Sequence, residues 1–349
     1  MKDTKYFEES ALDLILMAER AQLDFEESFE KDYYSLMDSL KSDIYKFFQK
    51  YQKDGKVSYS DTRKYLTAAE QKEFIKRVNF ILDIAKTNGY DSSFISEMEK
   101  YLKRINITRL ETLEVEANFV IYQLDQIKRD DIPVFLSDVY EAVYYVAYYL
   151  LGKCMEEEID FVPLAEKDIT KLISVNWAGQ SFNTELSNNS KNLRDAVVKL
   201  IPQMFARGMS AEEMGTQLEK QLRSTKNQVK AISRTQINYI TNQSNLNMFK
   251  SVGVSKYQYC AILDMVTSEI CRELNGFVGN LSQAEPGVNF PPMHLHCRST
   301  VIPVFDKNYK PSSSEKTRVW RKTKLEDWIK QNVTSSSTEK VLEFVKKYY

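Results

Sequence analysis

The C-terminal part of the chain contains the sequence YQYCAILDMVTSEICRELNGFVGNLSQAEPGVNFPPMHLHCRSTVIPV, residues 257–304. Both histidines of the protein and three of its four cysteines fall inside this stretch. Three short segments, 257–263, 276–278 and 299–305, are rich in β-branched and aromatic residues, and Gly and Pro lie between them, which is typical of strands joined by turns. The pattern predicts a small antiparallel sheet around a Cys/His cluster.

The rest of the sequence is typical of long helices. Only 10 Gly and 8 Pro occur in 349 residues, and apolar side chains recur at three- and four-residue steps, for example over 5–53 and 92–128. Thr67–Glu70 and Ser210–Glu213 have the pattern of capping boxes that begin helices. Because proline lacks the backbone N–H that a helix interior uses, a helix break is expected at Pro133, and a kink or a new helix start is expected at Pro202.

These patterns predict a mainly α protein. An elongated N-terminal helical region is expected to precede an α+β C-terminal domain with a small antiparallel sheet and a Cys/His knuckle. The expected domains are a helical one at 1–158, a second one at 159–305, and a tail at 306–349 whose last residues have the pattern of a short amphipathic helix.

The composition argues against several classes of protein. A formal net charge of -1 gives no reason to expect a broad nucleic-acid-binding surface. No apolar run is long enough to span a bilayer, so membrane insertion is not expected. The four cysteines fit a chain that folds in a reducing compartment better than they fit a secreted disulfide scaffold.

One local group of cations is a candidate for DNA contact. It lies on and before the predicted helix that precedes the sheet, and it comprises Lys220, Arg223, Lys226, Lys230 and Arg234. Such runs are also typical of solvated helix faces. A DNA contact requires binding that falls steeply with salt concentration.

The Cys/His cluster offers a candidate metal set in Cys271, His294 and Cys297. Zinc takes thiolate and imidazole ligands in tetrahedral geometry, and a structural site has four of them. Candidates for the fourth ligand are His296, Asp264, Cys260 and a water molecule. Two other interpretations stay open: the thiols pack as small apolar residues, or they form a disulfide, which requires an oxidising or protected environment.

A Cys/His pair can also serve nucleophilic catalysis. However, His294 lies almost next to Cys297, no oxyanion-hole glycine motif accompanies them, and the chain has neither a P-loop nor a dinucleotide-binding glycine pattern. We therefore expect that the protein is not an enzyme. The alternative is a metal-dependent hydrolase or a nucleic-acid-acting enzyme that uses the Cys/His cluster.

The order of residues in this stretch resembles one protein family. A helix ends at Gly253, a strand leads to Asp264 and Thr267, and a Leu-x-Gly segment precedes the Pro-Pro-x-His-x-x-Cys-Arg segment at 291–298. This order is similar to that of the phage head morphogenesis proteins, also called Mu F-like minor head proteins. The structural knuckle that the resemblance implies comprises Asp264, Thr267, Gly276, Pro291, Pro292 and Arg298.

The resemblance extends upstream, with departures. Trp177, Gly179 and Phe182 look like the Trp-x-Gly-x-x-Phe loop of the family. Ser268 stands where the family has the first cysteine of its Thr-Cys-x-x-Cys segment, and Ser299 replaces the second cysteine of its Cys-Arg-Cys segment. Because serine is a poor zinc ligand, these two changes favour a packed knuckle over a filled metal site.

The resemblance implies a phage minor head protein. It implies a location inside the head of the virion near the portal vertex, and in the host cytoplasm during assembly. The implied role is to support head assembly and DNA packaging or ejection. The implied partners are the portal protein, the major capsid or scaffolding protein, and the packaged DNA, and the one cofactor considered is zinc.

Overall fold

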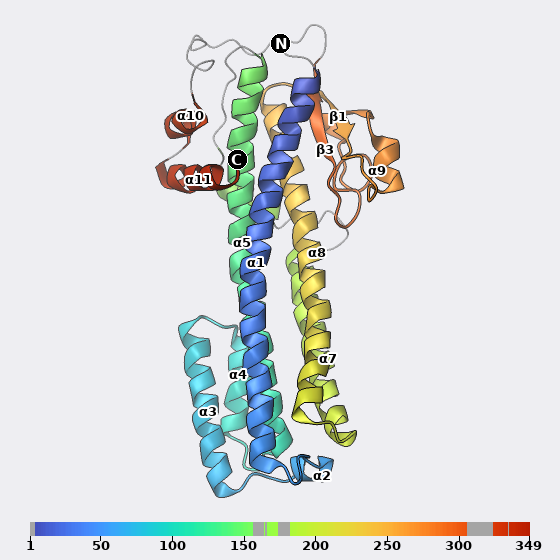
Figure 1. The fold of residues 1–349 in the computed structure, drawn as a ribbon. Helices are drawn as coiled ribbons and strands as arrows, with labels where there is room; N and C mark the ends of the chain where they lie inside the picture. The colour runs from blue at the N-terminus through green and yellow to red at the C-terminus, as the bar shows by residue number, and fades with distance from the viewer. Residues whose placement is uncertain (1–3, 156–163, 165, 174–181, 306–323, 334) are drawn as a thin grey trace. The chain divides into compact units, whose positions relative to one another are not determined.

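The computed structural model describes residues 4–155, 164, 166–173, 182–305, 324–333 and 335–349. It is mainly α with a three-stranded antiparallel sheet near the C-terminus (Figure 1), which confirms the predicted fold class. The α-helices of the described residues are α1 (Thr4–Tyr51), α2 (Tyr59–Thr62), α3 (Ala68–Thr87), α4 (Ser92–Leu102), α5 (Arg109–Met155), α6 (Glu166–Ile173), α7 (Phe182–Ala206), α8 (Ala211–Ser251), α9 (Glu269–Leu274), α10 (Leu325–Asn332) and α11 (Ser335–Tyr348).

Two compact units make up the chain, and each draws on separate segments. The first contains 1–27, 131–185 and 229–349, and the second contains 28–130 and 186–228. The domains expected from the sequence are continuous in the chain, and the expected boundary after residue 158 lies outside the described residues. The division into domains at 1–158, 159–305 and 306–349 therefore stays a prediction.

In the second unit, α3, α4 and the first half of α5 share an apolar core. Val78, Ile81 and Met98 are fully buried in it. The predicted capping box begins α3: the Glu70 backbone N–H donates to the Thr67 hydroxyl, and the Glu70 carboxylate accepts from the Thr67 backbone N–H at 2.7 Å. Local capping and burial thus act together, because the cap fixes where the amphipathic helix starts and the core fixes which face it buries.

Asp91 caps α4, and its replacement by alanine should destabilise the second unit in a pH-dependent way. Its carboxylate accepts from the backbone N–H groups of Ser93 and Phe94, both at 3.0 Å, and from the Tyr122 hydroxyl. Burial opposes ionisation, but these hydrogen bonds outweigh it and lower the pKa of Asp91 from 3.8 to about 2.

A group whose pKa is lowered by folding adds stability above its unfolded pKa and loses it as the pH falls through its folded pKa. We expect Asp91→Ala to cost about 1 kcal/mol of unfolding free energy at neutral pH, as for other N-caps. The difference from the native chain should shrink between pH 4 and pH 2. Urea titrations across that range measure it, and a difference that does not depend on pH would contradict the assignment.

The sheet belongs to the first unit and has the order β2-β1-β3. Its strands are β1 (Lys256–Cys260), β2 (Val278–Asn280) and β3 (Thr300–Val304), and both pairings are antiparallel. Tyr257 and Tyr259 on the central strand are fully buried. Gly279 lies opposite Tyr257, and a Cβ at this glycine would come within 2.8 Å of the Tyr257 ring. The close approach of ring and backbone is therefore possible because position 279 has no side chain.

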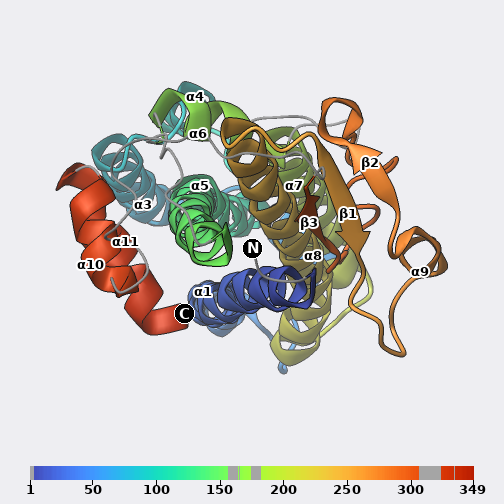
Figure 2. The same ribbon diagram turned by 90° about the horizontal axis from the view of Figure 1, so that it is seen from above.

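The C-terminal part of α8 attaches to the end of the sheet through a buried polar face. Asn238 and Asn242 both donate side-chain N–H groups to the backbone oxygen of Ser299, at 3.0 and 3.1 Å. One helical turn earlier, the hydroxyl of Thr235 accepts the backbone N–H of His296 at 3.0 Å. Figure 2 shows β1 and β3 beside this part of α8. α8 thus holds the segment that carries His294 and Cys297 at two points, His296 and Ser299.

The helix break predicted at Pro133 was wrong, and no new helix starts at Pro202. α5 continues through Pro133 and α7 continues through Pro202. The neighbouring apolar side chains, Ile132 and Leu136 in α5 and Ile201 in α7, are fully buried, and their packing outweighs the lost hydrogen bond. Among the helices of the described residues, none combines the length and the apolar character needed to cross a bilayer.

Candidate Cys/His site

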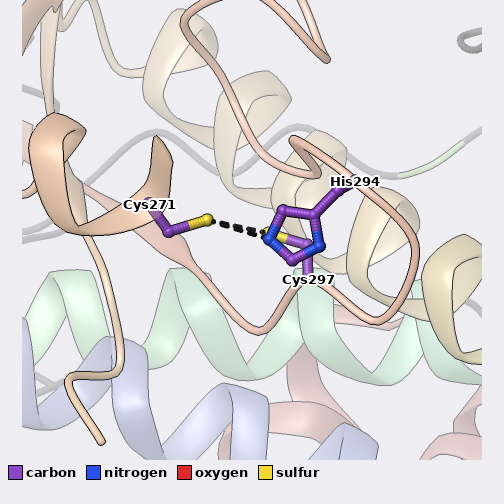
Figure 3. Close-up of side chains that lie close together, drawn as sticks. All are labelled: Cys271, His294 and Cys297. Carbon is purple, nitrogen blue, oxygen red and sulfur yellow. Dashed lines mark hydrogen bonds between the residues drawn. The ribbon is translucent and has the colours of Figure 1, made fainter. Parts of the chain in front are cut away.

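Three side chains from two segments of the chain form the candidate site. Cys271 lies in the first turn of α9, whereas His294 and Cys297 lie in the loop before β3. The Cys271 Sγ atom is 3.2 Å from His294 Nε2 and 3.8 Å from Cys297 Sγ. Figure 3 shows the three side chains pointing toward one another, and their potential ligand atoms all lie within 4.8 Å. The structure thus brings together the three residues of the candidate metal set.

The imidazole of His294 has an orientation that suits a ligand. Its Nδ1 atom is 2.7 Å from the backbone oxygen of Leu295. A carbonyl oxygen only accepts hydrogen bonds, so Nδ1 carries the proton and Nε2 carries the free lone pair. That Nε2 faces Cys271 Sγ and also lies 2.7 Å from the hydroxyl of Ser268. The arrangement is the one in which histidine binds metals, with the second nitrogen fixed by the backbone.

The two thiols share a hydrogen bond in a buried environment. Cys271 and Cys297 are 2% and 3% exposed, and Met293 and Tyr259 pack against them. The hydrogen bond from Cys297 lowers the pKa of Cys271, and the same bond raises the pKa of Cys297. The Tyr259 hydroxyl donates a further hydrogen bond to Cys271 Sγ at 3.3 Å. The pair therefore favours one thiolate at Cys271, with Cys297 as the proton donor.

The other candidates for the fourth ligand have different surroundings. The Asp264 carboxylate binds Arg298 at 2.5 Å and accepts from the Thr267 hydroxyl at 2.9 Å. His296 is exposed, with a positive φ of 62°, and Cys260 is half-buried at the end of β1. In the described part of the chain, the group that could hold a metal contains none of these three.

Ser268 lies beside the cluster, although it was expected from the sequence to be a lost ligand. It caps α9, and its hydroxyl accepts the Cys271 backbone N–H at 3.4 Å. The available signal was the spacing, because residues three apart at a helix start lie on the same side. The hydroxyl therefore reaches the same imidazole nitrogen as the Cys271 thiol.

The remaining knuckle residues build a rigid frame around the cluster. The Thr267 hydroxyl donates to the Ile262 backbone oxygen at 2.5 Å, and Arg272 Nε donates to the Thr267 backbone oxygen at 3.1 Å. Gly276 has a φ of 84°, which favours glycine, and its N–H donates to the Tyr259 backbone oxygen at 2.8 Å. Pro291 and Pro292 are buried. These residues close the turns that hold α9 against β1.

The comparison with family models covers this whole region. Residues 195–302 match the family described as Phage Mu protein F like protein. Because of this similarity, we call residues 195–302 the Mu F-like domain. The match begins in α7, contains α8 and the Cys/His site, and ends in β3. Searches of curated proteins and of solved structures found no significant match.

The match confirms the family resemblance for the Mu F-like domain and leaves residues 1–194 and 303–349 unassigned. The similarity indicates a phage head-related role for this segment. The family is one of structural head proteins. The upstream loop that also carried the resemblance, with Trp177 and Gly179, lies outside the described residues.

A groove runs beside the Cys/His site of the Mu F-like domain. It has a volume of about 700 Å³, and its walls come from α1, α8 and the loops that carry Val266 and Leu295. His294 and Cys297 line it, as does Glu19 of α1. Burial raises the pKa of Glu19, against the opposing effect of the nearby Arg298 and Arg234 guanidinium groups. The site is therefore accessible from one side, although both of its thiols are buried.

Most of the candidate DNA-contact residues on α8 bind acidic side chains of the chain itself. The ion pairs are Arg223–Glu219 at 3.2 Å, Lys226–Glu30 at 3.2 Å, Lys230–Glu26 at 2.9 Å and Arg234–Glu26 at 2.7 Å. Lys226 is only 6% exposed, whereas Lys220 is exposed. An engaged cation has less charge to offer a phosphate, so these pairs weaken the case for DNA contact, which stays a prediction.

Proposed function

We propose that this chain is a phage minor head protein that binds at the portal vertex inside the head and supports head assembly and DNA packaging or ejection. The observation that carries the proposal is the match of residues 195–302 to the Mu F-like family. The match includes every residue of the Cys/His site and the helix that anchors it. Portal protein is the proposed partner, and contacts with capsid or scaffolding protein and with DNA are part of the same proposal.

Exposed apolar side chains on the Mu F-like domain support a protein–protein contact. Met265 and Val266 are 99% and 79% exposed, and Leu295, which lines the same groove as Val266, is 59% exposed. Exposed apolar groups that lie close together mark interaction sites more often than single ones do. We call Met265 and Val266 the apolar finger.

The backbone of the apolar finger is fixed before any partner binds. The Val266 N–H donates to the Asp264 carboxylate at 3.0 Å, and the Asp264 N–H donates to the Thr267 hydroxyl oxygen at 2.8 Å. Arg298 holds the same carboxylate from the loop before β3. A preorganised apolar group loses little conformational entropy on binding, so it favours tight association.

The contacts of the cluster favour a structural role over hydrolysis, which was the alternative from the sequence. Asp264, the acid beside the cluster, is held by Arg298 and Thr267. Glu19 lines the groove, but no hydrogen bond joins it to the cluster in the described part of the chain. A metal hydrolase needs a general base within reach of a bound water. Hydrolysis therefore has no specific observation that favours it.

Association with the portal protein is the test of this proposal. The full chain would be coexpressed with the portal protein of the same phage, which carries the affinity tag. We expect the two proteins to elute together in size-exclusion chromatography after affinity purification. An unrelated protein that carries the same affinity tag serves as the control for unspecific capture. Separate elution of chain and portal at micromolar concentrations of both would contradict a portal-bound role.

A further inference from the structure

We propose that Cys271, His294 and Cys297 bind one divalent cation of the zinc type, with the Ser268 hydroxyl beside the fourth coordination position. Nothing in the family match assigns this site, and the proposal does not depend on portal binding. It uses two thiolates and one imidazole, the donor set that soft and borderline metal ions such as zinc select.

The distances between the donor atoms suit tetrahedral coordination. Two sulfur atoms bound to zinc at about 2.3 Å lie roughly 3.8 Å apart in a tetrahedron, and a sulfur and an imidazole nitrogen lie roughly 3.5 Å apart. The corresponding distances in the structure are 3.8 Å between the two Sγ atoms and 3.2 Å between Cys271 Sγ and His294 Nε2. The third pair, Cys297 Sγ and the His294 ring nitrogen, lies within 4.8 Å, so shifts of about 1 Å or less would bring all three donors to one ion.

Neighbouring residues fix the donor side chains in place before any ion binds. The Leu295 backbone oxygen fixes the His294 tautomer so that Nε2 is the free donor. The Tyr259 hydroxyl contacts Cys271 Sγ, and α8 holds the His296 backbone beside the third ligand. The donors thus come from α9 and from a loop anchored by α8, and a bound ion would cross-link segments 26 residues apart.

Ser268 explains why the site would be weaker than a four-ligand zinc site. Its hydroxyl is 2.7 Å from His294 Nε2 and accepts the Cys271 backbone N–H, so it lies next to the same centre. A neutral hydroxyl is a poor ligand, and the fourth position would be taken by this oxygen or by water. The Asp264 carboxylate, one of the fourth ligands expected from the sequence, is held by Arg298. His296, the other one, does not belong to the group of described residues that could hold a metal.

Cobalt titration of the full chain under a phosphine reductant tests the site. Co²⁺ bound by thiolates gives a charge-transfer band, and tetrahedral Co²⁺ gives strong visible bands, so the spectrum reports the ligands as well as the stoichiometry. We expect one equivalent of Co²⁺ with both features, displaced by Zn²⁺. Cys271→Ser should abolish the charge-transfer band or weaken binding at least tenfold.

The chain offers matched controls for each ligand type. Cys260→Ser removes a thiol outside the cluster, and His296→Ala removes the other histidine, so neither should change the titration. The proposal is overturned if the native chain shows no thiolate–cobalt band, or if Cys260→Ser reduces the band as much as Cys271→Ser does. Circular dichroism of each variant without metal identifies a loss of band that results from misfolding.

A gain of affinity gives a second, independent measurement. Ser268→Cys places a thiolate beside the fourth position and should tighten Co²⁺ and Zn²⁺ binding by at least tenfold, with a stronger charge-transfer band. Ser268→Ala should leave the three-ligand site in place and change affinity by less. Equal affinities for the native chain and Ser268→Cys would contradict the placement of Ser268 at the fourth position.

Discussion

Replacement of both residues of the apolar finger by aspartate, Met265→Asp with Val266→Asp, is expected to weaken association with the portal protein by about a hundredfold or more. Both side chains are largely exposed, so the change should not disturb the core of the Mu F-like domain. It places two charges where apolar groups would be buried on binding, and desolvation of an unpaired charge is costly. Apparent affinities from titrations with immobilised portal protein measure the effect.

The control for this double variant is an equally exposed apolar residue outside the Mu F-like domain. Ile105, between α4 and α5, is 81% exposed, and Ile105→Asp should leave portal affinity unchanged. If Ile105→Asp weakens binding as much as the finger variant does, the contact is unspecific. If neither variant has an effect while the native proteins associate, the portal contact lies on another surface and the apolar finger has no role in it.

Gly279→Ala is expected to destabilise the first unit by about 1–3 kcal/mol, the typical range for overpacked core positions. An added Cβ would lie 2.8 Å from the ring and hydroxyl of Tyr257, which is fully buried. The ring cannot turn away freely, because its hydroxyl donates to the Asn289 backbone oxygen at 2.9 Å and Phe290 packs against it at a centroid distance of 5.3 Å. Denaturant unfolding followed by near-ultraviolet circular dichroism, which is sensitive to buried tyrosines, would show the loss.

Gly215→Ala is the matched control. Gly215 lies inside α8, where an added Cβ meets only the flexible Lys41 side chain at 3.3 Å. Alanine is the better helix former by about 1 kcal/mol, so this variant should be neutral or slightly stabilising. The same replacement by alanine is thus expected to lower stability at Gly279 and to leave it unchanged or raise it at Gly215. A native-like stability of Gly279→Ala would show that strand β2 shifts to accommodate a side chain.

The parts of the fold that follow from local chemistry could be predicted from the sequence. The capping boxes at Thr67 and Ser210 mark true helix starts, because a cap depends on residues three apart and on nothing distant. The Pro133 prediction failed for the complementary reason. A proline penalty is local, but the burial of Ile132 and Leu136 that outweighs it depends on packing with side chains far away in the chain.

The sequence predicted which residues form the candidate site, but it could not predict the contacts between them. Sequence order selected Cys271, His294 and Cys297 because soft ligands rarely gather by chance, and the structure places them together. The sequence could not show that Ser268 reaches the same nitrogen, since that contact depends on how α9 meets the loop before β3. The ion pairs of the α8 cations could not be predicted from the sequence either, because Glu26 and Glu30 lie about 200 residues before the cations they bind.

The two asparagines of α8 that share the backbone oxygen of Ser299 have a consequence for folding cooperativity. If the end of the sheet opened alone, two amides 7% and 0% exposed would lose a partner without gaining water. The free energy needed to open β3 alone is therefore close to that needed to open β3 together with α8. Amide hydrogens of β3 and α8 should then exchange with solvent through one shared opening event. The resistance of the Cys/His loop to local opening therefore depends on a helix that begins some 80 residues earlier in the chain.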